Sequence, residues 1–270
     1  MTALETLALV YALGGTLIGL LTGGRVDVFL TTIIGLSALL ALVAFVLVRF
    51  FGLSVDLARA LAGVTLTFIV YAALPPLLDL RLGAVIDRQL WELERGLFGT
   101  TAVELLDPFV SDELTLLFAT IYTVHAPLFF IPAILHWRAG RRDRAERLLL
   151  ALALAMYVGF VGYAIWPALG PVGTIRTLRP LGTNPATQVV ASYGVALGTF
   201  PSLHAGICSI VAIDAWRTSW RWGVVFTLVA AGIWSSTLYL RYHWVPDLFA
   251  GLVLAAMAYW LAGRTRPRTA

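Results

Sequence analysis

Two histidines of this sequence stand where their side chains can do chemistry. His204 lies in the segment FPSLHAG, and His243 lies in STLYLRYHWVPD, where Asp247 follows it by four residues. If this second segment is helical, the spacing places His243 and Asp247 on one face. A carboxylate bonded to one imidazole nitrogen fixes the tautomer and makes the other nitrogen a better nucleophile. We therefore predict His243 as a nucleophile that Asp247 orients.

The surroundings of both histidines suit a phosphate. Pro201 is typical of a first helical turn, so a helix is expected from about Phe200, with Ser202 and His204 in its first turn. Free N–H groups and the helix dipole favour an anion there. Arg241, two residues before His243, can clamp phosphate oxygens in a bidentate manner. The alternatives are a plain helix start with an interfacial histidine, and an interfacial loop with snorkelling side chains.

Composition places these residues in a membrane. Of 270 residues, 60% are hydrophobic and 13% are charged, against about 25% charged in an average soluble domain. Too little polar surface remains for a soluble globular or a disordered chain, which leaves an integral membrane protein. All 19 basic residues are arginine, and without lysine neither a P-loop nor Schiff-base chemistry is possible. The single Cys208 excludes a disulfide framework and a cysteine-based metal site, and we expect it to pack in the core.

We predict an all-α, polytopic membrane bundle of about eight spans. A span needs roughly 20 apolar residues, and the candidate segments lie near 3–22, 28–48, 58–78, 113–136, 148–167, 200–217, 221–240 and 245–262. The arginines between them indicate topology rather than nucleic-acid binding. Twelve arginines would face the cytoplasm, as would both termini, and seven would face outward. His204 and His243 then lie at outward ends of spans, at one membrane depth, which predicts an extracytoplasmic site.

Two outward stretches are not simple loops. In residues 83–99, Ile86, Leu90, Leu93 and Leu97 form an apolar helical stripe, which predicts an amphipathic helix lying flat at the interface. Residues 168–199 form a long stretch rich in glycine and proline. Loops of this length are usually functional.

Taken together, the two histidine segments resemble a known family. FPSLHAG followed by YLRYHWVPDLFAG resembles the last two signature motifs, PSxH and SRxxxxxHxxxD, of the type-2 phosphatidic acid phosphatase superfamily. Two segments, YLRYHWVPD and the upstream IDRQLWELERGLFG, are similar to those of the inositol phosphorylceramide synthase branch. The resemblance implies a six-span catalytic domain over residues 56–263, which includes the interfacial helix 83–99. Two additional spans in 1–55 would precede it, and a basic cytoplasmic tail, 264–270, would follow.

The resemblance also implies roles for individual residues. His243 would attack phosphorus and form a phosphohistidine, and Asp247 would orient and charge-stabilise His243. His204 would protonate the leaving group and then activate the acceptor. Ser202 and nearby amides would hold the phosphate oxygens. The superfamily uses neither a metal nor another cofactor, so the implied partners are membrane lipids and a lipid phosphate substrate.

Two departures from the family pattern concern the phosphate pocket. The arginine of SRxxxxxHxxxD falls on Thr237, and Arg241 lies one helical turn from that position. The lysine of the first family motif, KxxxxxxRP, falls on Val172, although Arg179 and Pro180 match its end and Arg176 can supply the missing charge. The preceding WPALGPVG resembles the proline-rich first motif of the synthase branch.

These departures favour a phosphotransferase that moves a phospho-headgroup to an alcohol acceptor. A lipid phosphate or polyprenyl diphosphate phosphatase, with water as the acceptor, is the first alternative. A transporter or channel, with His125 and residues 168–199 lining a path, is the second.

Three remaining polar residues yield further predictions. His125, in the middle of a span, is a functional candidate, but we favour a buried histidine bonded to a neighbouring helix. His136, beside Trp137 and Arg138, is expected to be a cytoplasmic interfacial anchor. Asp214 is expected to pair with Arg217, three residues later.

Overall fold

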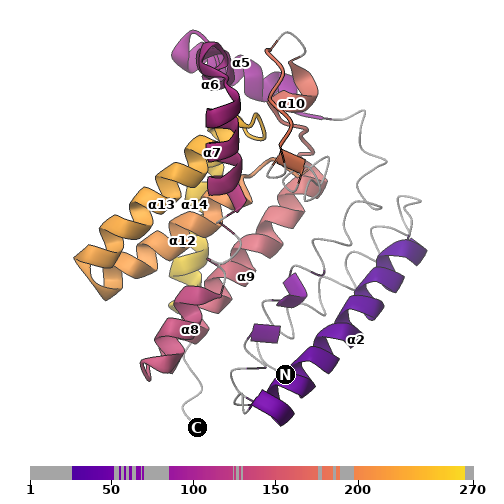
Figure 1. Cartoon of the computed structure of the whole chain (residues 1–270), viewed down its shortest axis with the longest axis vertical. Helices are drawn as coiled ribbons and strands as arrows, with labels where there is room; N and C mark the ends of the chain where they lie inside the picture. Colours follow the sequence, from indigo (N-terminus) through magenta and orange to yellow (C-terminus); the bar gives the residue numbers. More distant parts are fainter. Residues whose placement is uncertain are drawn as a thin grey trace.

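The chain folds as a helical bundle capped at one end by short helices (Figure 1). The computed structural model describes residues 26–51, scattered positions between 55 and 69, and then 85–123, 125, 128, 130–175, 178–184, 187–188 and 198–264. Within these residues the regular structure is helical, apart from one parallel bridge between Ala168 and Gly198. The helices are α2 (Val26–Phe51), α5 (Asp87–Phe98), α6 (Ala102–Leu106), the 3₁₀ helix η2 (Asp107–Phe109), α7 (Asp112–Thr123), α8 (Ile131–Arg138), α9 (Arg142–Ile165), α10 (Pro171–Thr174), α12 (Leu203–Thr218), α13 (Trp220–Tyr239) and α14 (Val245–Ala262).

The core lies where α9, α12 and α14 meet. Ala145, Ala151 and Ala155 of α9 are fully buried, and such small side chains let neighbouring helices approach closely. At the level of the predicted site, a Cβ atom at Gly251 of α14 would collide with the carbonyl oxygen of Ser202. Glycine at this position therefore allows the start of α12 to lie directly against α14.

The described helices confirm a multi-pass membrane protein. Four of them are long and apolar enough to cross a bilayer, namely α2 over Leu30–Phe50, α9, α13 and α14. Large apolar side chains such as Leu228, Phe249 and Val253 are exposed on the outer faces of α13 and α14, where lipid would cover them. These helices and α12 agree with the predicted segments 28–48, 148–167, 200–217, 221–240 and 245–262.

The predicted span 113–136 is wrong as a single helix. The segment forms two helices, α7 and α8, and His125 lies in the break between them. The sequence places Pro127 in this break, and proline removes a backbone donor and clashes with the preceding turn. The predicted span 3–22 and most of 58–78 lie outside the described residues, so the number of spans remains a prediction.

The predicted interfacial helix is present but shorter, since α5 begins at Asp87 rather than near residue 83. It lies across the end of the bundle with α6 (Figure 1). Of the predicted apolar stripe, Leu90 is buried, whereas Leu93 and Leu97 are exposed. The buried face of α5 also carries two acidic residues, Asp87 and Glu94, at 2% and 1% exposure, which the sequence analysis did not single out.

At the opposite end of the bundle, the predictions for His136 and Asp214 are wrong. His136 is buried at 5% exposure, and its Nε2 lies 2.6 Å from Oδ2 of Asp214. The Tyr259 hydroxyl donates to the other oxygen of Asp214 at 2.9 Å. Arg217 instead lies over the Tyr259 ring, 5.4 Å from its centroid. Asp214 therefore pairs inside the bundle with α8 and α14, because these helices present donors nearer than its own i+3 neighbour.

Candidate active site

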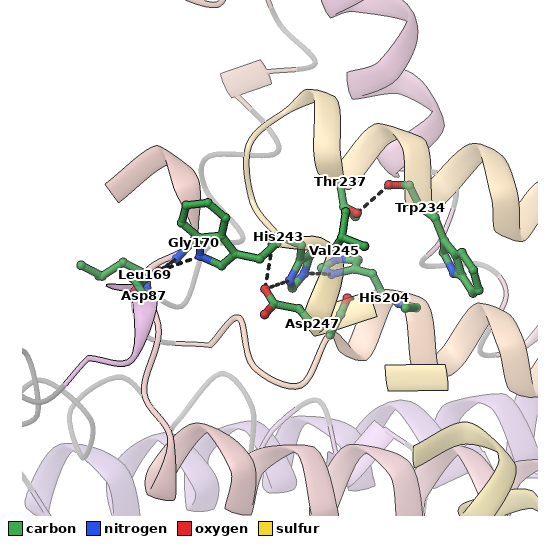
Figure 2. A network of polar contacts seen from close by, with 12 residues as sticks. Asp87, Leu169, Gly170, His204, Trp234, Thr237, His243, Val245 and Asp247 are labelled. Carbon is green, nitrogen blue, oxygen red and sulfur yellow. Dashed lines mark hydrogen bonds and ion pairs between the residues drawn. The ribbon is translucent and has the colours of Figure 1, made fainter. Parts of the chain in front are cut away.

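The three residues of the predicted catalytic group come together at the α5 end of the bundle. His204 lies in the first turn of α12, His243 in the turn between α13 and α14, and Asp247 in the first turn of α14. Nδ1 of His204 lies 3.2 Å from Nε2 of His243, and Nδ1 of His243 lies 3.3 Å from Oδ2 of Asp247 (Figure 2). His243 and Asp247 are buried, and His204 is half-buried.

This geometry determines which nitrogen of His243 can react. A carboxylate only accepts hydrogen bonds, so Nδ1 of His243 carries the proton that it donates to Asp247. In the neutral ring the lone pair is then on Nε2, the atom that faces His204. The arrangement places a nucleophilic nitrogen opposite a second imidazole, with a carboxylate behind the nucleophile.

Ser202 lies at the start of α12, but as its N-cap rather than inside its first turn. The helix begins at Leu203, so the predicted start near Phe200 was about three residues early. The Ser202 hydroxyl accepts a hydrogen bond from the Ala205 amide at 3.3 Å, as is usual for an N-cap serine. The Ser202 amide donates to the Asp247 carbonyl at 3.0 Å. Ser202 thus joins the two helices that carry His204 and Asp247.

Arg241 occupies an unusual backbone position at the end of α13. Its φ angle is +65°, and the Tyr242 amide donates back to the Thr237 carbonyl at 2.9 Å. This is the helix-ending geometry in which glycine is the usual residue. The guanidinium lies 3.0 Å from Oδ1 of Asp107, and burial lowers the pKa of Arg241 while the Asp107 carboxylate opposes that shift. Thr237, at the position of the family arginine, is fully buried.

Of the other two predicted arginines, only Arg179 falls within the described residues. Its backbone amide donates to the same Oδ1 of Asp107 at 2.9 Å, and its guanidinium donates to the Pro108 carbonyl at 3.3 Å. The side chain of Arg179 is exposed. Asp107 therefore joins the two segments that carry Arg241 and Arg179. Arg176 lies outside the described residues.

His125 lies next to the catalytic group. Its ring centroid is 4.5 Å from that of His204, and Tyr122 packs against His204 with centroids 4.6 Å apart. Nδ1 of His125 donates to the Tyr122 carbonyl at 2.6 Å, since a carbonyl only accepts. The residue is half-buried in the break between α7 and α8, and both interpretations of His125 stay predictions.

Sequence reasoning missed the acidic residues around the site. Asp87 accepts hydrogen bonds from the amides of Leu169 and Gly170 and from the Trp244 indole (Figure 2). Glu94 accepts from the Ala102 and Val245 amides. Their spacing was the available signal, because residues seven apart share a helix face, and this face also holds the buried Leu90.

The surroundings of Glu94 shift the pKa of its carboxyl group in opposite directions. Burial raises the pKa of the Glu94 carboxyl, and the hydrogen bonds from the Ala102 and Val245 amides act to lower it. Amide donors stabilise the ionised form of a carboxylate. Glu94 is thus held beside the turn between α13 and α14 that contains His243, which we call the catalytic turn, by donors that match its negative charge.

Comparison with known proteins agrees with this site. A family model described as the PAP2 superfamily matches residues 88–261, a range that includes His204, His243 and Asp247. The catalytic subunit of inositol phosphorylceramide synthase from Saccharomyces cerevisiae is 33% identical over 33% of this chain and 22% of its own length. Phosphoinositol dihydroceramide synthase from Bacteroides thetaiotaomicron is 28% identical over 45% of this chain and 47% of its own length.

These matches cover less than half of each curated relative, with 20% for inositol phosphorylceramide synthase from Candida albicans. No solved structure matches the chain. The family model, by contrast, spans more than half of the chain and the whole of the described catalytic group. The chain therefore belongs to the PAP2 superfamily, and within it resembles the inositol phosphorylceramide synthases.

Proposed function

We propose that this protein transfers a phospho-headgroup from a lipid phosphate ester to an alcohol acceptor, through a phosphohistidine on His243. One observation carries the proposal, namely that Nε2 of His243 faces His204 at 3.2 Å while Asp247 bonds the opposite nitrogen. This is the arrangement that a nucleophile, its orienting carboxylate and a proton donor require.

The reaction runs in two displacements at phosphorus. The lone pair on Nε2 of His243 attacks phosphorus, the bond to the lipid oxygen breaks, and His204 gives its proton to that oxygen. The acceptor hydroxyl then loses its proton to His204 and attacks phosphorus, and the phosphorus–nitrogen bond breaks. The two imidazoles are in direct contact, so the phosphoryl group must enter between their nitrogens.

Phosphoryl transfer depends mainly on positioning and on neutralising charge. We assign the phosphate oxygens to the first amides of α12 with Ser202, and to Arg241, Arg179 and Arg176. Arg241 and Arg179 belong to segments that both bond Asp107, which supports a shared role. An incoming phosphate would compete with Asp107 for the Arg241 guanidinium.

The names of the curated relatives support a transferase rather than a phosphatase. Both names describe the synthesis of a phosphoinositol sphingolipid. The contact of His125 with His204 supports an enzyme over a transporter, because it places this histidine at the reacting group. We place the site on the extracytoplasmic side and expect no metal requirement.

Turnover in liposomes tests the proposal. The purified protein is given phosphatidylinositol with ceramide, phosphatidic acid or a polyprenyl diphosphate, and both new lipid and free phosphate are followed. We expect new lipid without free phosphate, unchanged by EDTA, and a loss of about 1,000-fold or more in His243→Ala. The control is Glu92→Gln, an exposed residue of α5.

Each other outcome has a definite meaning. Free phosphate without new lipid would identify a phosphatase with water as the acceptor. Full turnover in His243→Ala would contradict the phosphohistidine. No product from any substrate with the wild-type protein would contradict the assignment of the site.

A further inference from the structure

We propose that α5 is a clamp on the catalytic turn, and that Asp87 and Glu94 are positioning residues for His243. The inference rests on the proposed function of His243. Both carboxylates are almost completely buried, and within the described residues neither is hydrogen-bonded to His204 or His243. They act on the residues that directly follow His243 in the chain.

Three carboxylates from two helices converge on Trp244 and Val245. Asp247 accepts the Trp244 backbone amide at 2.9 Å. Asp87 accepts the Trp244 indole N–H at 3.0 Å, and Glu94 accepts the Val245 amide at 2.8 Å. The Trp244 amide, the Trp244 indole and the Val245 amide are thereby all bound, directly after the nucleophile in the chain.

Glu94 completes the start of α14. The first amides of a helix have no partner within the helix, and Pro246, at the second position of α14, has no N–H. The Val245 amide at the first position is therefore an orphan donor, which Glu94 satisfies from another helix. Its second oxygen accepts the Ala102 amide at 2.6 Å, so α5, α6 and α14 are joined at one carboxylate.

Asp87 bonds the turn that contains His243 through different partners. Besides Trp244, it accepts the amides of Leu169 and Gly170, each at 2.8 Å. Gly170 has a φ of +77°, and a Cβ atom there would collide with the Tyr242 carbonyl. The loop that Asp87 holds therefore lies directly against the residue preceding His243, so Asp87 bonds both this loop and Trp244, while Glu94 bonds Val245.

A carboxylate is needed at both positions because each oxygen receives only donors. In Asp87→Asn or Glu94→Gln, one acceptor oxygen becomes an NH₂ group, which would face a backbone or indole N–H. The substitution preserves side-chain size, so it loosens the clamp without creating a cavity. We expect the turn to shift, and a displacement of about 1 Å at a reacting group can cost about 100-fold in rate.

The experiment compares Asp87→Asn and Glu94→Gln with the matched control Glu92→Gln. Glu92 is on the same helix, is exposed and pairs with the exposed Arg88. We expect kcat to fall about 10- to 100-fold in both clamp variants with KM for the donor lipid little changed, and no change in the control. Turnover is expressed per folded molecule, because loss of folding would lower the protein yield and the apparent kcat together.

A second measurement does not depend on turnover. Diethyl pyrocarbonate modifies imidazoles that solvent reaches, and His243 is only 2% exposed. We expect faster modification of His243 in both clamp variants, measured by mass spectrometry, with His136 at the far end of the bundle as the internal reference. Trp244→Phe, which removes the indole N–H together with part of a fully buried ring but keeps Asp87 and Glu94, should give a change in the same direction.

The two proposals fail in different ways. If the wild-type protein has no turnover, the proposed function fails, and the reactivity of His243 alone decides whether α5 is a clamp. If the wild type turns over while Asp87→Asn and Glu94→Gln match it in both kcat and His243 reactivity, the clamp is overturned and the proposed function stands.

Discussion

At the scale of single residues, the backbone conformation of Arg241 is unusual for an arginine. Its φ of +65° lies in the left-handed region, which costs a non-glycine residue roughly 1–2 kcal/mol. Glycine is the common residue at this helix end, so the guanidinium must supply something that outweighs the strain. Its contact with Asp107 and its place two residues before His243 support the proposal that it supplies charge at the phosphate.

Arg241→Gly and Arg241→Ala separate the backbone from the side chain. Both variants lose the guanidinium, and we expect both to lose about 100-fold or more in turnover, as when one oxyanion-binding donor is removed. Only glycine relieves the strain, so Arg241→Gly should be more stable than Arg241→Ala by about 1 kcal/mol. Turnover and thermal unfolding in detergent measure both effects. Near-normal turnover in both variants would remove Arg241 from the phosphate site.

At the scale of the helices, α8, α12 and α14 are joined by a polar cluster far from the reacting groups. His136 bonds Asp214 at 2.6 Å, and Tyr259 bonds the other carboxylate oxygen at 2.9 Å. His136 and Asp214 are both nearly inaccessible to solvent. A complete buried pair of this kind changes the stability of a protein little. Removing one partner is strongly destabilising, because the other polar group is left buried without a counterpart.

We therefore expect His136→Leu to destabilise the bundle by about 3 kcal/mol, which corresponds to roughly 6–12 °C in apparent Tm. The double variant His136→Leu/Asp214→Leu should recover part of this loss, because both buried polar groups are replaced by apolar ones. Turnover per folded molecule at low temperature should stay close to wild type in both. A single variant as stable as wild type would contradict the role of this pair.

Helices that are recognisable by their apolarity alone could be predicted from the sequence. Features that depend on contacts between residues far apart in the chain could not. Uniform apolarity identifies α9, α13 and α14, but it conceals the break at His125 between α7 and α8. The catalytic group was predictable because His243 and Asp247 are neighbours in the chain. The spacing of Asp87 and Glu94 could have placed them on the Leu90 face of α5, but not beside their partner atoms, which lie 157 and 151 residues away at Trp244 and Val245.

At the scale of the whole molecule, the site and the main arginine cluster lie at opposite ends of one helix. α9 has 24 residues, or about 36 Å at 1.5 Å per residue, which exceeds the roughly 30 Å of a hydrocarbon core. It begins at Arg142, close in the chain to Arg138 at the end of α8 and to Arg141 in the turn, and ends at Ile165 near α10 and α5 (Figure 1). Because arginine-rich loops stay on the cytoplasmic side, the catalytic group is expected on the outer side.

Labelling of single cysteines tests this orientation. Cys208 is the only cysteine and is buried, so Cys208→Ala provides a background without reactive thiols. Gly96→Cys places a thiol in open space on α5, and Ala139→Cys places one on the exposed turn between α8 and α9. A membrane-impermeant maleimide should label position 96 in intact cells and position 139 only after permeabilisation. The reverse pattern would put His243 on the cytoplasmic side and require its lipid substrate in the inner leaflet, whereas labelling of both positions in intact cells would contradict a membrane-spanning α9.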